Sequence, residues 1–164
     1  MASPAPVDLV GLLEGSAIEH IAKEHKLSPR QVVERLPPEM CRLGPASAFV
    51  DVMTDIAHWG EVTIIVHSED GIIEFTGPVP KGETARGHYN LLARTGFHGH
   101  LRPNRCGGVA FIERPLMGRP SAAVLFFNVD DGIMFKIYVG RDQRRELRSD
   151  QMAAFGALAK RVCG

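Results

Sequence analysis

The sequence is poor in cysteine and carries no net charge, and each of these shortages excludes a class of protein. Its 164 residues include three cysteines, Cys41, Cys106 and Cys163, which are widely spaced and form no Cys-x-x-Cys pair. This argues against a disulfide framework or a thiolate zinc site and favours a reducing compartment, so we expect a cytoplasmic protein. Lysine plus arginine and aspartate plus glutamate number 19 each. The charge therefore gives no reason to expect nucleic acid or an anionic membrane as the partner.

Segments for membrane targeting and the common catalytic motifs are also missing. No apolar run approaches the roughly 20 residues of a membrane-spanning helix, and residues 1–6 lack the basic stretch that opens a signal peptide. There is no Gly-x-Ser-x-Gly nucleophile motif and no glycine-rich phosphate loop. The acidic pairs 69–70 and 130–131 lie at expected hairpin turns, where acidic residues are favoured for turn geometry alone. We therefore expect a protein that is not an enzyme.

The residues that are present have the composition of one globular domain. Apolar residues make up 45% of the chain and charged residues 23%, as is typical of soluble proteins. A chain of this length can bury a core without disulfide or metal staples. The apolar pattern predicts a single domain with a mainly helical part (1–60), a part made of strands (61–140) and a final helix (148–163).

Apolar periodicity and capping residues predict four helices in the N-terminal part and one at the C-terminal end. Ser28-Pro29 is a strong helix start, because serine caps free amide groups and proline suits the first turn. Pro37-Pro38 ends that helix. The expected helices cover residues 7–13, 16–25, 28–36, 47–59 and 149–162. The second and third could form a DNA-reading helix-turn-helix, although such hairpins are also common packing units.

After Gly60 the apolar period changes to two, which is typical of strands. The expected strands cover residues 61–68, 72–76, 88–93, 97–101, 108–114, 122–128 and 132–139. Their connections are too short for crossover helices and carry the residue types of hairpin turns. This predicts an antiparallel sheet, and we expect the helices to cover one side of it, which makes the fold class α+β.

Strand 122–128 is apolar on both faces, because Val124 and Phe126 alternate with Leu125 and Phe127. A sheet covered by helices on one side needs only one apolar face. The second apolar face implies a partner subunit or a large apolar ligand. A sheet curled into a barrel would also bury both faces.

Three histidines lie on or at the end of expected strands. His98 and His100 flank Gly99 and would share one face of strand 97–101, while His67 lies near the end of strand 61–68. Neutral imidazole is the commonest protein ligand of transition metals. With a carboxylate, His98 and His100 could hold a non-haem iron or zinc ion.

The same residues also suit haem, which needs axial ligands, an apolar slot for the porphyrin and cationic groups for the propionates. The surplus apolar surface favours haem over a bare ion. The ligand candidates are His67, His100 and Tyr89, the apolar candidates are Ile65, Phe97, Phe126 and Phe127, and the cationic candidates are Arg86, Arg94 and Arg102.

Six short segments carry a resemblance to a known family. They are WGEVT (59–63), IVH (65–67), GH (99–100), FIERPLMG (111–118), LFFN (125–128) and KIYVGRD (136–142). Together they resemble the bacterial cytosolic haem-utilisation carriers, the HutX/HuvX/ChuX-like intracellular haem-binding proteins. The resemblance runs from about the first helix to the last.

The resemblance implies a saddle-shaped antiparallel sheet flanked by N- and C-terminal helices. It also implies a homodimer, similar to the two fused halves of the larger haem-trafficking proteins. The implied role is to bind haem in the cytoplasm and pass it to a haem-degrading enzyme. Two other functions stay open, a haem-degrading enzyme and a non-haem metal protein that uses His98 and His100.

The resemblance also extends to individual residues. His67 and His100 fall on the two positions that the family associates with haem binding, so we expect His100 as the principal ligand and His67 as the second. The chain has His88-Tyr89 before Asn-Leu where relatives carry Tyr-Phe, and His98 is an additional histidine. Tyr89 and His98 are therefore alternate ligands, and Arg86 and Phe97 complete the expected site.

Overall fold

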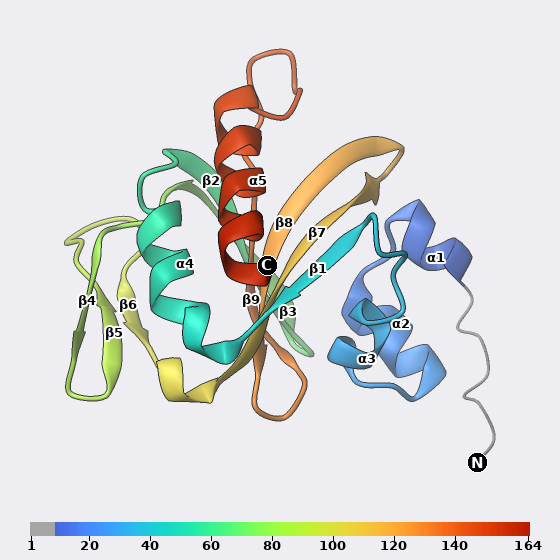
Figure 1. Cartoon of the computed structure of the whole chain (residues 1–164), viewed down its shortest axis with the longest axis horizontal. Helices are drawn as coiled ribbons and strands as arrows, with labels where there is room; N and C mark the ends of the chain where they lie inside the picture. The colour runs from blue at the N-terminus through green and yellow to red at the C-terminus, as the bar shows by residue number, and fades with distance from the viewer. Residues whose placement is uncertain (1–8) are drawn as a thin grey trace.

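The computed structural model describes residues 9–164 and confirms an α+β fold with a large antiparallel sheet (Figure 1). The first two residues of the expected helix 7–13 lie outside the described residues. The helices are α1 (Leu9–Glu14), α2 (Ile18–His25), α3 (Pro29–Val33), α4 (Phe49–Ile56) and α5 (Ser149–Cys163), with short 3-10 helices η1 (Ala46–Ala48) and η2 (Pro103–Arg105). The strands are β1 (Cys41–Gly44), β2 (Glu61–Ser68), β3 (Gly71–Pro78), β4 (Gly82–Ala85), β5 (His88–Leu91), β6 (Gly99–Leu101), β7 (Cys106–Leu116), β8 (Arg119–Asn128) and β9 (Ile133–Tyr138).

The strands form two sheets rather than one. A six-stranded antiparallel sheet has the order β1-β7-β8-β9-β2-β3, and a separate three-stranded sheet has the order β4-β5-β6. The chain leaves the large sheet after β3 through Pro78-Val79-Pro80, where prolines cannot donate ladder hydrogen bonds. The strands β1 and β4, of four residues each, were not predicted from the sequence.

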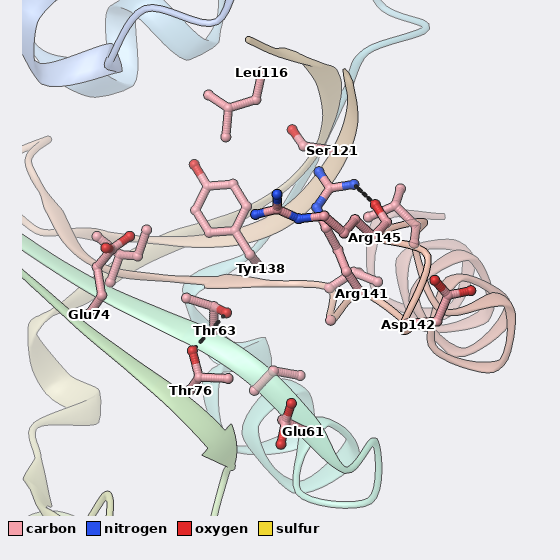
Figure 2. A pocket seen from close by; sticks show the side chains of 15 residues that line it. Glu61, Thr63, Glu74, Thr76, Leu116, Ser121, Tyr138, Arg141, Asp142 and Arg145 are labelled. Atoms are coloured by element: carbon pink, nitrogen blue, oxygen red, sulfur yellow. Dashed lines mark hydrogen bonds between the residues drawn. The ribbon is translucent and has the colours of Figure 1, made fainter. Parts of the chain in front are cut away.

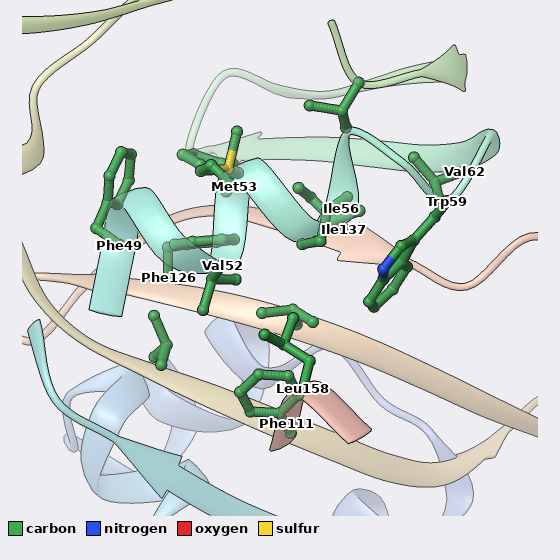
Figure 3. Packing of buried hydrophobic residues seen from close by; sticks show 14 of the residues in the cluster. Phe49, Val52, Met53, Ile56, Trp59, Val62, Phe111, Phe126, Ile137 and Leu158 are labelled. Atoms are coloured by element: carbon green, nitrogen blue, oxygen red, sulfur yellow. The ribbon is translucent and has the colours of Figure 1, made fainter. Parts of the chain in front are cut away.

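Helices α4 and α5 cover one face of the large sheet and form the larger part of the core with it (Figure 3). The apolar residues of α4 recur three and four positions apart, so they share one stripe. Phe49 at the start of this stripe lies edge-on to Phe126 of β8, with ring centroids 5.5 Å apart. Phe155 of α5 packs in the same way on Phe111 of β7, at 5.4 Å.

Helices α1, α2 and α3 cover the opposite face, so the expectation that helices cover only one side of the sheet was wrong (Figure 1). Leu125 and Phe127 of β8 pack there in one cluster with Leu12, Ile18 and Val33. The second apolar face of β8 is therefore covered by the chain's own helices and needs no partner or ligand. Phe126 and Phe127 were wrong as haem contacts, because both side chains are fully buried.

The hairpin of α2 and α3 is a packing unit of this second cluster. Its predicted start at Ser28 is confirmed, since the Ser28 hydroxyl accepts from the Gln31 amide while the Gln31 side chain accepts from the Ser28 amide. Arg30 of α3 donates to the carbonyl of Gly107 at 2.8 Å, and its guanidinium lies over the Phe127 ring. A cation that the helix would offer to DNA is thus engaged within the protein.

Candidate functional site

The two principal predicted ligands lie on opposite faces of the large sheet. Ile65 and His67 point to the face of Leu125, which α1–α3 cover. His100 lies on β6 of the small sheet, whose neighbouring strand contributes Tyr89 to the core cluster of the other face. No haem within one chain can therefore be ligated by both histidines.

His67 lines a cleft of about 620 Å³ between α2 and the end of β2. Its side chain is 20% exposed, and its Nδ1 lies 3.1 Å from Oε2 of Glu19 on α2. The same carboxylate oxygen accepts from the Lys136 ammonium at 2.8 Å, and Lys136 is buried. The other oxygen of Glu19, Oε1, is buried without a hydrogen-bond partner. His20 also lines this cleft, and the sequence analysis did not consider it.

His100 lies opposite Asn90 of β5 on an exposed strand edge. Its Nδ1 is 2.6 Å from the side-chain oxygen of Asn90, which directs the Nε2 edge of the ring away from the sheet. The neighbouring cleft of about 450 Å³ brings an imidazole, apolar side chains and two arginines together. Its lining residues are His100, Leu101, Arg102, Arg105, Asn128, Met134 and Phe135.

His88 is a neighbour of His100 that the sequence analysis missed. The two rings are 6.0 Å apart at their centroids and are nearly perpendicular. The Nδ1 of His88 lies 3.1 Å from the carbonyl of Arg86, and a carbonyl only accepts, so Nδ1 carries the hydrogen. The parity of β5 already places His88 and Asn90 on one face. Only the pairing of β5 with β6 brings His100 to that face.

The other predicted site residues have different surroundings. His98 was wrongly placed on a strand with His100, since β6 begins at Gly99 and His98 lies exposed in the preceding loop. Tyr89 is 2% exposed and packs edge-on against Phe49 in the core, so its role as an alternate ligand was wrong. Phe97 stacks on Phe75 at 5.7 Å and is half-buried.

The cationic candidates also differ in position. Arg102 lines the cleft of His100. Arg86 lies exposed at the tight turn between β4 and β5, where it has a positive φ of 54°. Arg94 is exposed in the loop before β6.

A third cleft, of about 370 Å³, lies over β2, β3 and β9 (Figure 2). Tyr138 forms its floor, and burial raises the pKa of this phenol. Arg141 and Arg145 face it from the segment before α5, while Glu61 and Glu74 face it from β2 and β3 (Figure 2). No histidine is among its lining residues. This cleft therefore offers no imidazole for an iron atom.

A family model for haem utilisation proteins, ChuX/HutX, matches residues 42–158. The chain belongs to the ChuX/HutX family. The matched region contains His67, His88 and His100, together with the whole of both sheets except the first residue of β1.

Individual relatives support this membership. An intracellular heme transport protein, HutX of Vibrio cholerae, is 38% identical over 139 residues, which are 84% of this chain and 72% of the relative. A protein of known crystal structure from Erwinia carotovora is 41% identical, with a TM-score of 0.91 over 98% of this chain and 99% of that one. The haem-binding protein ChuX is 35% identical, with a TM-score of 0.86 over 96% and 98% of the two chains.

The fold is also that of half of a larger protein. PhuS of Pseudomonas aeruginosa, 17% identical, matches 98% of this chain with 48% of its own length, at a TM-score of 0.76. At this level of identity the likeness concerns the fold alone. It agrees with the implied relation between this ChuX/HutX chain and the halves of larger haem-trafficking proteins.

Cysteine thiolates as iron ligands and a non-haem metal site are both disfavoured in this ChuX/HutX chain. Burial raises the pKa of Cys41 to about 11 and also raises the pKa of Cys106 and Cys163, so at neutral pH these thiols stay protonated and are poor iron ligands. Within residues 9–164 no cluster of three or more His, Cys, Asp or Glu side chains could hold a metal ion. The non-haem site expected from His98, His100 and a carboxylate was therefore wrong.

None of the described helices is long and apolar enough to span a bilayer.

Proposed function

We propose that this chain binds haem in the cytoplasm and carries it to a haem-degrading enzyme without degrading it. The observation that carries the proposal is the cleft beside β6, which joins the exposed His100 imidazole to an apolar lining and two arginines. Membership of the ChuX/HutX family supports it, as does the naming of the HutX relative as an intracellular heme transport protein.

The residues of this cleft suit the three parts of a haem. The Nε2 of His100 would ligate the iron, since Nδ1 is held by Asn90. Leu101, Met134 and Phe135 would contact the porphyrin. Of the two arginines in this cleft, Arg105 is paired with Asp130 at 2.6 Å, whereas Arg102 has no ion-pair partner among residues 9–164 and is therefore available for a propionate. Bound haem would supply the iron that the acceptor enzyme releases.

The exposure of His100 is what a carrier requires. The ligand lies on a short edge strand rather than in a closed cage, so haem can leave without unfolding of the core. A degrading enzyme would instead need to hold haem while oxygen and a reductant reach it.

The test is a haemin titration of the wild type and of His100→Ala, followed by Soret absorbance. We expect a saturable Soret shift near one haem per chain for the wild type, and an affinity about 10-fold or more lower for the variant. His58→Ala is the matched control, because His58 is exposed in the turn after α4 and this variant should bind like the wild type. Equal affinities for His100→Ala and the control would contradict His100 as principal ligand.

The same loaded protein tests transfer against turnover. With a haem-degrading enzyme added, the Soret band should move to that of the acceptor. With ascorbate alone in air, the band of the carrier should persist. Loss of the band with formation of a bile pigment would favour the enzyme alternative.

We also propose that the chain forms a homodimer through the β2–β3 end of the large sheet. β3 is an edge strand of eight residues, and its Ile72 and Ile73 are 58% and 69% exposed. Apolar side chains on an unpaired edge are a typical pairing surface.

Sedimentation should give twice the 17.9 kDa chain mass. Ile72→Lys/Ile73→Lys should give the mass of one chain. Met117→Lys, at an even more exposed apolar residue of the β7–β8 turn, should leave the dimer intact. A monomeric wild type would contradict the proposal.

A further inference from the structure

We propose that the cleft between the start of β8 and the loop that precedes α5 binds a phosphoryl group, at a site separate from the haem cleft. The loop has four arginines in eight positions, Arg-Asp-Gln-Arg-Arg-Glu-Leu-Arg (141–148). The chain as a whole carries no net charge, so this excess of positive charge is local. Arginine is the residue most suited to binding phosphate, because its planar group donates several hydrogen bonds at once.

The structure brings three of these arginines and a fourth from β8 to one cleft. This cleft, of about 510 Å³, is lined by Arg119, Arg141, Arg144 and Arg145, and Glu146 is the one carboxylate among its lining residues. We call it the arginine cleft. Four arginines against one glutamate leave an excess of three positive charges on its walls. A ligand with two or three negative charges would balance them.

Three of the four arginines are left without a partner by the protein. Among residues 9–164, no carboxylate oxygen lies within ion-pair distance of Arg119, Arg144 or Arg145, whereas Arg105 and Arg161 are each paired with aspartate. One unpaired arginine on a protein surface is ordinary. Three of them on one cleft repel each other, and an anion would relieve this repulsion.

The aspartate of the loop orders the backbone instead of pairing with a guanidinium group. The Oδ1 of Asp142 accepts from the backbone amides of Arg144 at 2.8 Å and of Glu146 at 3.1 Å. The Asp142 amide also donates to the carbonyl of Glu146, and the Arg145 amide donates to the carbonyl of Asp142. The arginines are therefore presented by an ordered loop, which lowers the entropy cost of binding a ligand.

Arg141 is a positioning residue of this cleft. Its guanidinium group donates to the carbonyl of Pro120 at 2.7 Å and to that of Arg145 at 3.2 Å, and Figure 2 shows the second of these bonds. Arg141 thus holds the loop against the start of β8 while its charge stays in the cleft. The side chains of Arg119, Arg144 and Arg145 are the donors available to a ligand.

Arg145 has a backbone conformation that does not suit an arginine. Its φ is 64°, in the left-handed region, where glycine fits and other L-residues are strained. Strained residues persist where the surroundings fix them, and they are frequent at functional sites. Glycine would form this turn with less strain, so the presence of arginine is explained by a use of its side chain.

The surroundings of the arginine cleft indicate the class of ligand. A phosphoryl group offers three acceptor oxygens and up to two negative charges, so it can engage several guanidinium groups together, whereas a carboxylate has one charge. An adjoining cleft, of about 450 Å³, shares Arg119, Pro120 and Leu147 with the arginine cleft and has a mainly apolar wall that includes Met152. The ligand that fits both is a phosphorylated molecule with an apolar part, either free in solution or a lipid headgroup.

The arginine cleft is far from the haem cleft. Arg119 is the first residue of β8, and Asn128, which lines the cleft of His100, is the last. A strand of ten residues extends over roughly 30 Å. We therefore expect the phosphorylated ligand and haem to bind independently.

The first test is a titration of the full chain with inorganic pyrophosphate, followed by its ¹H–¹⁵N amide resonances. At about 0.15 M salt the Debye length is about 8 Å, so long-range attraction is screened. We expect saturable shifts at one site per chain, largest at residues 141–147 and 118–121. Arg144→Gln should lower the affinity about 10-fold, because it removes charge-assisted hydrogen bonds. A wild type without saturable shifts would overturn the proposal.

The second test separates binding from folding. Arg145→Gly should lower the pyrophosphate affinity about 10-fold, while its unfolding temperature should be no lower than that of the wild type, because glycine relieves the strain. Arg86→Gly is the matched control, since Arg86 is also exposed and has a φ of 54°, but lies in the β4–β5 turn away from the cleft. Equal affinities of the two glycine variants would overturn the proposal.

A third test distinguishes the two sources of the phosphoryl group. Co-sedimentation with vesicles of equal parts phosphatidylcholine and phosphatidic acid, lost in Arg144→Gln and absent with phosphatidylcholine alone, would identify a lipid headgroup. Saturable binding of pyrophosphate without such co-sedimentation would identify a free phosphorylated molecule. Haem affinity should be the same in Arg144→Gln as in the wild type. A loss of haem binding in this variant would show that the arginines belong to the haem site, which would overturn the proposal of a separate site.

Discussion

The double variant His67→Ala/His100→Ala is expected to lose the saturable Soret shift at haemin concentrations that saturate the wild type. Both candidate imidazoles, which line two separate clefts, are then gone. What is left for haem is apolar contact and the arginines that line the cleft of His100. We expect affinity to fall roughly 100-fold, which is about 2.8 kcal/mol at 1.4 kcal/mol per tenfold change.

The single variants His67→Ala and His100→Ala test the contribution of each histidine separately. Because His67 and His100 lie on opposite faces of the large sheet, they cannot ligate one haem within a single chain. With one haem bound per chain at His100, His100→Ala should lose most of the affinity, whereas His67→Ala should lose little. If His67→Ala loses all binding, both histidines act on one haem, which would have to lie between two chains. Full retention of the Soret band in the double variant would contradict both assignments. Unfolding curves that match the wild type serve as the control for the fold.

Much of the fold could be predicted because it follows from local patterns. The start of α3 depends on two reciprocal hydrogen bonds between Ser28 and Gln31, which are close in the sequence. The strand β2 follows from its alternating side chains, and β8 from an apolar run that is bounded by turn residues. The assignment of helices to faces could not be predicted in this way. The sequences of α1–α3 contain no local pattern that indicates which face of β8 these helices cover. The structure shows the face, because Phe127 of β8 packs among them.

The candidate site could also be predicted only as far as local sequence patterns allow. His67 and His100 could be identified from residue type and strand position. The burial of Tyr89 could not, because its ring packs against Gly82 of a strand too short to recognise, where a side chain would collide with the ring. The contact between Glu19 and His67 could not be predicted either, since the two residues are far apart in the sequence and meet only when α2 docks on β2.

Replacement of Gln151 by leucine is expected to destabilise the protein by about 3–6 kcal/mol, since three buried backbone groups lose their partner at roughly 1–3 kcal/mol each, less partial relaxation. Gln151 lies on α5 and is 2% exposed. Its amide nitrogen donates to the carbonyls of Trp59 and Glu61 at 3.0 and 2.7 Å, and its oxygen accepts from the Gly140 amide at 2.7 Å. These three hydrogen bonds of one side chain connect α5 to the residues at the start of β2 and to the segment that follows β9.

No other group can take over these contacts. Gly140 approaches so closely that a side chain there would collide with the carbonyl oxygen of Glu61, so water has no space to replace the amide. Leucine keeps the volume, and the loss measured by urea unfolding therefore reports hydrogen bonding rather than a cavity. Gln143→Leu, at an exposed position before α5, is the control and should change stability by no more than about 0.5 kcal/mol. A loss for Gln151→Leu as small as that of the control would mean that the backbone groups find other partners, and that α5 is held by its apolar face alone.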